Sequence, residues 1–409
     1  MPLVYVDELA AGMVLADDLL TPSGRFVLAA GAELQAQHLQ LLKSWGVIEA
    51  DIEAASLGES CADQQAVTAA HEDQARLWLQ PRFALNNPEQ EPVATLYRHL
   101  VHFFALRFAQ GWEPNALAGV PRGGGTIPPP LSMPQLLKGG EDIFSLPTLY
   151  AHLVELLRKP TTSTAQIAAV VGKDANLTVR LLRLVNSPFY SFSGRVDSVS
   201  RAVSLIGMDE LTSLTLGVTV VQQFRNLPIA LLDMDRFWRH SIRCGLFAKA
   251  LAEQLGERET EKYFTGGLLH DVGRLVLLER MPAQYAQAIA RARAESLPLY
   301  RAEQDCLKTD HSIIGKLLAE KWRLSATLIR MIGSHHSPRL ANYQPEACLL
   351  HSADILAHAC SDDLLLVKEV PQLQQTAWDK IGLGREVIAP VMQQVDAEFR
   401  EIVKVFFGD

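Results

Sequence analysis

The sequence is poor in cysteine and aromatic residues, and it has no strong excess of charge of one sign. Its five cysteines, Cys61, Cys244, Cys306, Cys348 and Cys360, are odd in number, widely spaced and never arranged as CxxC. This usage argues against a disulfide framework and predicts five reduced thiols, as in a cytoplasmic protein.

Long hydrophobic runs are also missing. No apolar run reaches the 18 or so residues that a membrane helix needs. The first residues, MPLVYVDELAAGMVLADD, carry early acids and no basic stretch, so they do not resemble a signal peptide. We therefore expect a cytoplasmic protein without a membrane span.

The charge balance limits the kind of partner. With 38 Lys and Arg against 46 Asp and Glu, the net charge is −8, which argues against an extended nucleic-acid-binding surface. Hydrophobic residues make up 48% and charged residues 21%, which is usual for a globular chain. A length of 409 residues predicts two or three domains.

The residue patterns divide the chain into five segments and predict a mainly α fold. Short β-leaning runs separated by glycines predict a small β-rich docking or regulatory module at the N-terminus. Helical periodicity follows, interrupted by a stretch rich in proline and glycine that is typical of a linker. The predicted segments are the β-rich module 1–55, a helical connector 56–118, the linker 119–140, an all-helical domain 141–360 with halves 141–225 and 226–360, and a C-terminal helical extension 361–409. Within the domain we expect Thr164 and Asp174 to cap helices.

The most informative stretch is FTGGLLHDVGRLVLLER, residues 264–280, which we expect to form one helix of three to four turns. It places His270 and Asp271 side by side among apolar residues. Burying an ionisable pair costs several kcal/mol unless each group finds a partner. The pair is therefore either a hydrogen-bonded part of the core or half of a metal site.

Further imidazoles and carboxylates lie on or at the ends of other segments with helical periodicity. They are His240 upstream and His311, His335, His336 and Asp354 downstream. Helices packed side by side can bring such residues to one point, as in metal-binding helical bundles. Each also has a structural interpretation: for example, His311 could open its helix beside Asp310, and His351 and His358 could face solvent.

The order His, His-Asp, His, His-His, Asp resembles the HD superfamily of metal-dependent phosphohydrolases. Residues 141–340 resemble more closely its related output branch, the HDOD domain. The stretches that carry this resemblance are DIFSLPTLYAHLVELL, VSRAVSLIGMDELTSLTLGV, HSIRCGLFAKALAEQL, GGLLHDVGRLVL and EQDCLKTDHSIIGKLLAEKW, followed by HHSP. The module 1–55 resembles the small β-rich module that precedes HD-GYP phosphodiesterase domains.

The resemblance implies a set of metal ligands. His240, His270, Asp271 and Asp354 match the four ligands of the HD pattern, and His311, His335 and His336 match positions that hold a second ion or the substrate. Asp271 would then bridge two ions. Arg274 stands where relatives often have Lys, and it could pair with a phosphate oxygen. Asp271 and Arg274 are thus the catalytic candidates. Imidazole with carboxylate suits one or two ions of Fe, Mn, Zn, Ni or Co, and no other cofactor is expected.

One departure keeps two functions open. The tandem histidines are followed by SPRLANYQPE, without the GYP motif of HD-GYP enzymes. The first hypothesis is a bacterial-type signalling protein whose HDOD domain is an output module with a His/Asp metal site. This module binds a protein partner or a nucleotide. A homodimer is the candidate assembly of the protein. The second is a metal-dependent phosphohydrolase or cyclic (di)nucleotide phosphodiesterase acting on a phosphoester.

Overall fold

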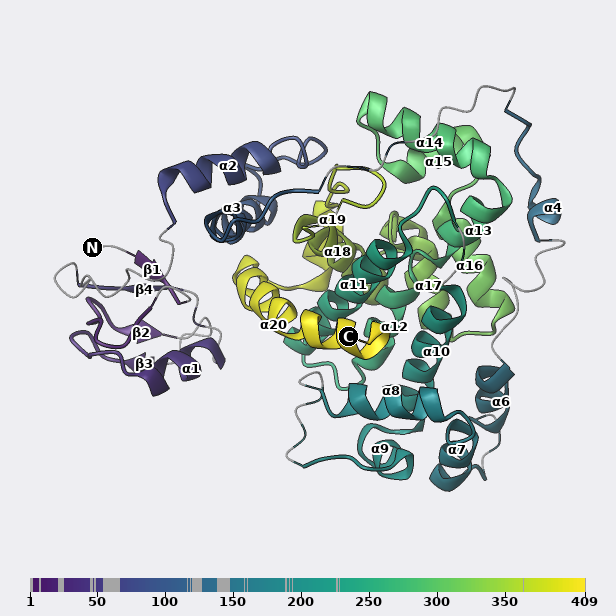
Figure 1. Cartoon of the computed structure of the whole chain (residues 1–409), viewed down its shortest axis with the longest axis horizontal. Coiled ribbons are helices and arrows are strands. Elements are labelled where there is room, and N and C mark those ends of the chain that lie inside the picture. The colour runs from purple at the N-terminus through teal and green to yellow at the C-terminus, as the bar shows by residue number, and fades with distance from the viewer. Residues whose placement is uncertain are drawn as a thin grey trace. The chain divides into compact units, whose positions relative to one another are not determined.

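The computed structural model is mainly helical, as the sequence predicts (Figure 1). It describes residues 3–6, 9–20, 26–44, 47, 49–53, 67–115, 117, 119, 127–137, 148–157, 159, 161–187, 190, 192, 194–225, 227, 229–362 and 364–408. The end of the predicted β-rich module (54–55), parts of the predicted connector (56–66, 116 and 118) and linker (120–126 and 138–140), and Cys61 lie outside these residues.

The chain divides into two compact units. The first contains Met1–Gln80, Pro88–Glu113 and Gly384–Gln394, and the second contains Pro81–Asn87, Pro114–Leu383 and Val395–Asp409. The second unit therefore includes a short segment that lies between two helices of the first unit in the sequence.

The first unit begins with a small β-rich part around its own core. Strand β1 (Leu3–Tyr5) pairs antiparallel with β4 (Glu49–Asp51), and β2 (Leu19–Leu20) pairs antiparallel with β3 (Phe26–Leu28). Together with helix α1 (Ala36–Ser44), this part encloses buried side chains that include Val6, Leu15, Leu34, Leu42 and Ile52. The other elements that lie in this unit are α2 (Ala69–Leu79), α3 (Val93–Ala109) and η4 (Arg385–Val387).

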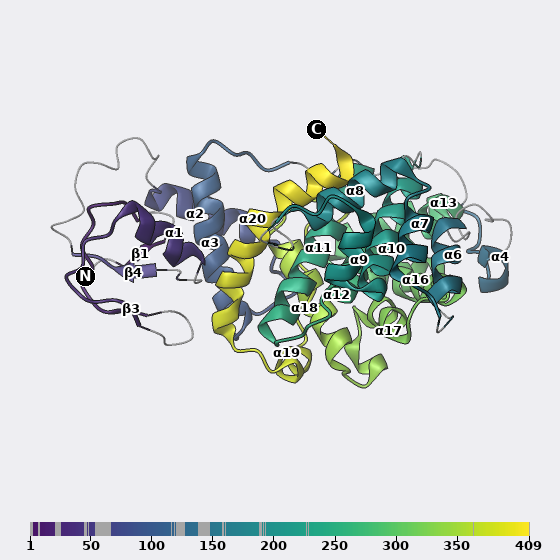
Figure 2. The ribbon, with the colours of Figure 1, turned by 90° about the horizontal axis from the view of Figure 1, so that it is seen from below.

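In the second unit, α4 (Met133–Leu137), α6 (Thr148–Leu157), α7 (Thr164–Val171), α8 (Ala175–Val185), α9 (Val199–Ile206) and α10 (Met208–Phe224) come first. Helices α6 to α10 lie together in both views of the ribbon (Figures 1 and 2). Asp174 caps α8 as predicted, with its Oδ1 accepting from Leu177 N at 2.9 Å. The predicted cap at Thr164 is wrong: Ser163 caps α7, and Thr164 is the first helical residue. Ser and Thr are both good caps, so composition alone cannot choose between adjacent ones.

The remaining helices form the half that carries the histidines. They are α11 (Met234–Gln254), α12 (Glu261–Leu269), α13 (Val272–Arg280), α14 (Pro282–Glu295), α15 (Leu299–Leu307), α16 (His311–Lys321), α17 (Ala326–Ser334), η3 (Pro338–Ala341), α18 (Pro345–Ala359) and α19 (Gln375–Ile381). Helix α11 packs on α12 and α18, α13 packs on α16, and α17 packs on both α16 and α18. The last helix, α20 (Ile388–Phe407), begins in the first unit and ends in the second.

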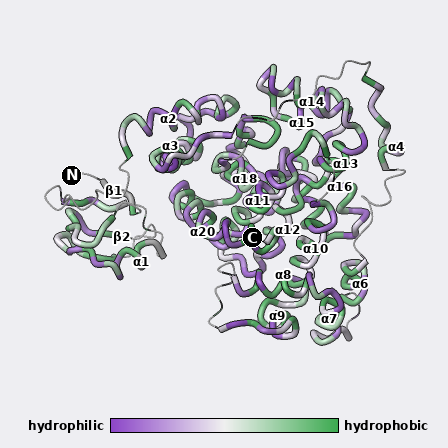
Figure 3. The backbone as a smooth tube through the Cα atoms, viewed as in Figure 1, coloured by the Kyte–Doolittle hydropathy of each residue, from purple (hydrophilic) through white to green (hydrophobic). Residues whose placement is uncertain are grey.

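Hydrophobic and hydrophilic residues alternate along most helices, which is the pattern of amphipathic helices packed around a core (Figure 3). Among the described residues, no single helix is both long and apolar enough to cross a membrane. Helices α9 and α10, which are bent by 119° relative to each other, meet that criterion of length and composition only when they are taken together.

Candidate metal centre

The His270–Asp271 step separates two helices. The prediction of one continuous helix over residues 264–280 is wrong, because α12 ends at Leu269 and α13 begins at Val272. Asp271 has φ −98° and ψ 2°, outside the α-helical region. Adjacent side chains on a helix diverge by about 100°. At this break they do not, and His270 and Asp271 point to the same place.

Glycines allow the helices around this step to approach closely. A Cβ atom on Gly267 of α12 would lie 2.5 Å from the Cα of Gly245 on α11. A Cβ atom on Gly273 of α13 would lie 2.1 Å from the carbonyl oxygen of His311 on α16. Only glycine fits such contacts between backbones. These contacts hold α11 close to α12, which precedes the His270–Asp271 step, and α16 close to α13, which follows it.

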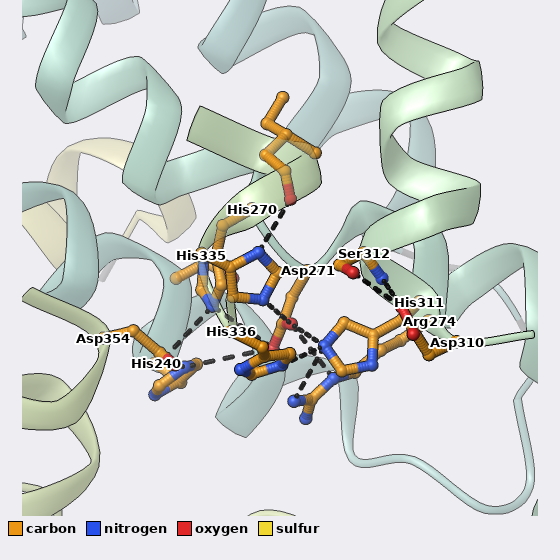
Figure 4. Close-up of polar contacts among 12 residues, drawn as sticks. His240, His270, Asp271, Arg274, Asp310, His311, Ser312, His335, His336 and Asp354 are labelled. Atoms are coloured by element: carbon orange, nitrogen blue, oxygen red, sulfur yellow. Dashed lines mark hydrogen bonds and ion pairs between the residues drawn. The ribbon is translucent and has the colours of Figure 1, made fainter. Parts of the chain in front are cut away.

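The first group of ligand candidates contains His240, His270, Asp271 and Asp354 (Figure 4). Asp354 Oδ1, on α18, lies 3.2 Å from His240 Nε2 and 3.4 Å from His270 Nε2. Asp271 Oδ2 lies 3.4 Å from His270 Nε2 and 3.9 Å from His240 Nε2. All four residues are buried. The structure thus brings together side chains from α11, α18 and the α12–α13 step.

The second group contains His311, His335 and His336, and it faces the other oxygen of Asp271. Asp271 Oδ1 lies 3.2 Å from His311 Nε2 and 3.9 Å from His335 Nε2. His336 Nε2 lies 2.7 Å from His311 Nε2. His311 is the first residue of α16, and Asp310 caps that helix, so the residue opens its helix and also faces the centre. The two carboxylate oxygens of Asp271 therefore face different groups of histidines.

The atoms at the centre fit a bound metal ion. Several are buried and make no hydrogen bond: His240 Nε2, His270 Nε2, His335 Nε2, Asp354 Oδ1 and both carboxylate oxygens of Asp271. Ligands that are each about 2.0–2.2 Å from one ion lie roughly 3.0–3.5 Å from one another. The shorter nitrogen–oxygen distances at the centre, 3.2 and 3.4 Å, have this spacing. Imidazole nitrogen with carboxylate oxygen is the donor set that divalent transition metals bind.

The electrostatics of the centre keep its carboxylates ionised. Burial alone would raise the pKa of Asp271, but Arg274, His270 and His311 hold it well below its ordinary value. Arg274 is the largest of these influences, with its Nε 3.0 Å from Asp271 Oδ1. Asp354 is likewise buried, yet His358 and His240 hold its pKa well below the usual range.

The histidines of the centre differ in charge. Burial lowers the pKa of His335 to about 3, and burial together with His335 and His311 lowers the pKa of His336 well below its ordinary value. Burial also disfavours a charged His270, but Asp271 and Cys244 raise its pKa well above the ordinary value. Neutral imidazoles and ionised carboxylates are the forms that coordinate a metal.

Outer hydrogen bonds fix the orientation of three of these rings. His270 Nδ1 donates to the Gly267 carbonyl at 2.6 Å, and His335 Nδ1 donates to the Ile332 carbonyl at 2.7 Å. His311 Nδ1 donates to Glu303 Oε2 at 2.6 Å. Because Nδ1 is used in each of these bonds, Nε2 is the nitrogen of each ring that faces the centre.

Three further residues lie around the centre and contact its side chains or the groups that hold them. Tyr285 OH donates to Glu303 Oε1 at 2.5 Å, so the carboxylate that holds His311 is itself held. His351, for which the sequence analysis gives a solvent-facing interpretation, is buried and donates from Nδ1 to the His335 carbonyl at 2.7 Å. His358 Nε2 lies 3.5 Å from Asp354 Oδ1.

A small pocket adjoins the centre. It has a cavity volume of about 20 Å³, and its polar lining consists of Arg274, Tyr300, His336, His358 and Glu369. A cavity of this size holds about one water molecule. The centre is therefore nearly closed on this side.

A short segment forms one wall of the pocket. Asn86 Nδ2 donates to the carbonyls of Val370 and Pro371 at 3.0 Å, and Asn86 Oδ1 accepts from Leu373 N at 2.9 Å. Gln374 Nε2 donates to the His336 carbonyl at 3.0 Å. Residues 370–374 are thus tied both to residue 86 and to the histidine-bearing part of the chain.

Comparison with known proteins identifies this helical region. Residues 143–338 match the HDOD domain family. The chain contains an HDOD domain. The match covers α6 to α17, and it therefore includes six of the seven predicted metal ligands, while Asp354 lies beyond its end.

A curated relative and solved structures extend the comparison. An uncharacterized protein of Treponema pallidum is 26% identical over 199 residues, which are 48% of this chain and 38% of that protein. The chain thus spans well under half of that relative. An HDOD domain protein of unknown function from Geobacter sulfurreducens is 22% identical, with a TM-score of 0.52, over 64% of this chain and 93% of its own.

Two other solved structures share the fold. A protein from Shewanella amazonensis described as a candidate phosphohydrolase is 24% identical, with a TM-score of 0.53, over 66% of this chain and 97% of its own. A protein from Marinobacter aquaeolei described as a candidate signal transduction protein is 17% identical, with a TM-score of 0.50, over 99% of this chain and 96% of its own. At these identities, the likeness establishes the HDOD fold. The resemblance of residues 1–55 to the module that precedes HD-GYP domains stays a prediction.

Sequence reasoning missed several residues around the candidate metal centre. Glu303 is the clearest case: it shares the buried face of α15 with Leu299, Ala302 and Leu307. A glutamate on an otherwise apolar helix face is a signal that can be read from the sequence. Cys244 is another, since it lies one helical turn after His240 and is buried near His270 and Asp354.

Proposed function

We propose that this protein is a signal-transduction protein whose HDOD domain binds a divalent transition metal and serves as an output module. The observation that carries the proposal is the convergence of His240, His270, Asp271 and Asp354, whose inward-facing atoms are buried and lack hydrogen bonds. Burying such atoms without a partner costs free energy. A cation coordinated there offsets that cost. Fe, Mn, Zn, Ni and Co are the candidates, because all accept imidazole and carboxylate ligands.

The closed pocket supports an output role over turnover. Sites for drug-sized ligands usually have volumes of about 300–1,000 Å³. The pocket beside Arg274 and His336 has a cavity volume of about 20 Å³. A nucleotide does not fit there unless the segment tied to Asn86 moves. In this proposal the metal stabilises a surface that a signalling partner recognises.

The remaining features belong to the same proposal. The protein is cytoplasmic, its N-terminal β-rich module docks or senses a signal, and its partner is a signalling protein or a nucleotide. A homodimer is its candidate assembly. The fold shared with the Marinobacter aquaeolei protein extends over 99% of this chain, and it supports a signalling role for the chain.

The second candidate function is a metal-dependent phosphohydrolase or cyclic (di)nucleotide phosphodiesterase. It is favoured by Asp271, whose two oxygens face two histidine groups, and by Arg274, which lines the adjoining pocket. A divalent ion, when bound, supplies Lewis acidity at a phosphoester oxygen and activates water. Asp271 would hold the ion or ions, and the guanidinium of Arg274 would bind a phosphate oxygen from the pocket.

Metal analysis followed by an activity screen tests both functions. The full chain is purified without chelator, its metal content is measured, and it is assayed against phosphomonoesters, phosphodiesters and cyclic dinucleotides with Mn²⁺ and Fe²⁺. The output-module proposal predicts bound metal without turnover. Turnover that disappears in Asp271→Ala would establish the enzyme instead. Metal-free wild type that takes up no added ion would overturn both.

A further inference from the structure

The two halves of the metal centre are unequal in their hydrogen bonding. In the first half, His240 Nε2, His270 Nε2 and Asp354 Oδ1 are buried without a hydrogen-bond partner. In the second half, His335 Nε2 also lacks a partner, but His311 and His336 are bonded to each other through their Nε2 atoms at 2.7 Å. Each of these two nitrogens thus already has a partner within the second half.

A cation also lies in the second half. Arg274 is 4% exposed, its Nε lies 3.0 Å from Asp271 Oδ1, and its Nη2 lies 3.5 Å from His311 Nε2. The contact with Asp271 is an ion pair and not a directional hydrogen bond, since neither atom makes a hydrogen bond. A guanidinium keeps its positive charge in proteins. Arg274 therefore compensates the charge of the carboxylate oxygen that faces the second group.

We infer that the centre holds one ion, bound by His240, His270, Asp271 Oδ2 and Asp354, and that Arg274 takes the place of a second ion at Asp271 Oδ1. The inference rests on the proposed metal binding and sets its stoichiometry. An ion in contact with both Asp271 Oδ1 and His311 Nε2 would lie beside the guanidinium, whose Nε is 3.0 Å from the first atom and whose Nη2 is 3.5 Å from the second. At an effective dielectric constant of about 20, two like unit charges about 4 Å apart weaken binding by the order of 1,000-fold, and a divalent ion doubles the repulsion energy.

This arrangement also gives Arg274 a role distinct from a phosphate-binding lysine. The pair with Asp271 uses Nε, and Nη2 lies near His311, so fewer guanidinium donors remain for a ligand oxygen in the pocket. His311 is thus bonded to Glu303 through Nδ1 and to His336 through Nε2, and Arg274 lies beside the same Nε2. The chain retains the residue types of a two-ion centre, and one residue, Arg274, keeps the second position closed.

Metal titration of two Arg274 variants, one that removes the positive charge and one that keeps it, tests the inference. The chelator-treated full chain is titrated with Co²⁺ by calorimetry, and the visible absorption of bound Co²⁺ reports the coordination of each equivalent. The variants are Arg274→Gln, which removes the charge, and Arg274→Lys, which keeps it. We expect one tight ion in wild type and in Arg274→Lys. In Arg274→Gln we expect a second ion, bound at least about 100-fold more tightly than any second ion in wild type, and this ion should be lost again in Arg274→Gln/His311→Gln.

The outcomes separate this inference from the proposed function. Two ions of similar affinity in wild type, or a single ion in a folded Arg274→Gln, would overturn the inference and leave metal binding intact. No ion in any variant would overturn the metal-binding proposal and the inference with it. Thermal melting shows which variants are folded. Should Arg274→Gln not fold, the stoichiometry of the wild type alone still decides between one ion and two.

Discussion

Glu303 holds His311 by two hydrogen bonds to a single carboxylate oxygen, which accepts from the ring Nδ1 at 2.6 Å and from the backbone N at 2.9 Å. Both residues are fully buried. One glutamate thus fixes the start of α16 and the ring that points to the centre. The position of His311 depends on α15 as much as on its own helix.

Replacing this glutamate should be costly. Glu303→Gln loses the charge of the acceptor and brings an amide N–H₂ into a buried position where only acceptors fit. We expect the free energy of unfolding to fall by about 2–4 kcal/mol. Tyr285→Phe, which removes only the hydroxyl that donates to Glu303, should cost about 1–2 kcal/mol. Urea denaturation of both variants measures the difference. A Glu303→Gln protein as stable as wild type would show that the carboxylate is not needed there.

The close contact between α13 and α16 gives a second prediction. In Gly273→Ala the new Cβ would meet the His311 carbonyl oxygen at 2.1 Å and Gly315 N at 2.6 Å, both of which are backbone atoms. The helices must separate, so we expect a loss of about 1–3 kcal/mol in stability and weaker metal binding. Gly194→Ala is the matched control, since no atom lies within 4 Å of a Cβ at that position. Thermal melting and metal titration of the pair test the prediction, and equal behaviour of the two variants would contradict it.

The segment tied to Asn86 gives a third prediction. Asn86→Ala removes three hydrogen bonds to Val370, Pro371 and Leu373, so residues 370–373 should open more often. Hydrogen exchange at Leu373 N should become faster. In Asn86→Asp the side-chain acceptor for that amide is retained while both donors are lost. We therefore expect Leu373 to stay more protected in Asn86→Asp than in Asn86→Ala. Unchanged exchange in Asn86→Ala would mean that other contacts hold the segment.

Alkaline pH provides a fourth prediction, through Tyr150 on α6. Burial raises the pKa of this phenol to about 12 from its ordinary 10.0. A raised folded-state pKa stabilises the protein below pH 10, and that contribution is lost as pH rises from 10 to 12. The loss should be about 1–2 kcal/mol over this interval. Tyr150→Phe has no group to ionise there, so the difference in urea stability between the two proteins should change with pH. A constant difference between pH 9 and 12 would refute the assignment.

Much of the HDOD half could be predicted because its pattern is local. Imidazoles and carboxylates at helix positions indicated a shared centre, and the structure brings all seven together. The break between His270 and Asp271 could not be predicted in this way. The apolar pattern of residues 264–280 continues through the break. A change in the dihedral angles of one residue does not alter that pattern.

The supporting residues escaped prediction for a different reason. Asn86 and Gln374 act through hydrogen bonds to backbone groups of residues distant in the sequence or in another element. Because backbone groups are the same at almost every residue, the sequence does not show which distant residue supplies the backbone partner of such a bond. A supporting role for Glu303 could have been predicted from the sequence. A charged side chain on an apolar helix face is costly to bury unless it has a polar partner.

Asp354 lies on α18, sixteen residues beyond the last residue of the family match at 338, and yet it contacts His240 and His270. A recombinant fragment cut at the edge of the recognised domain would therefore lack a carboxylate of the centre and would expose the side of α11 that α18 covers. If such a fragment took up no metal, the cause would be the loss of Asp354 and α18, and the result would not show that the full chain lacks a metal site.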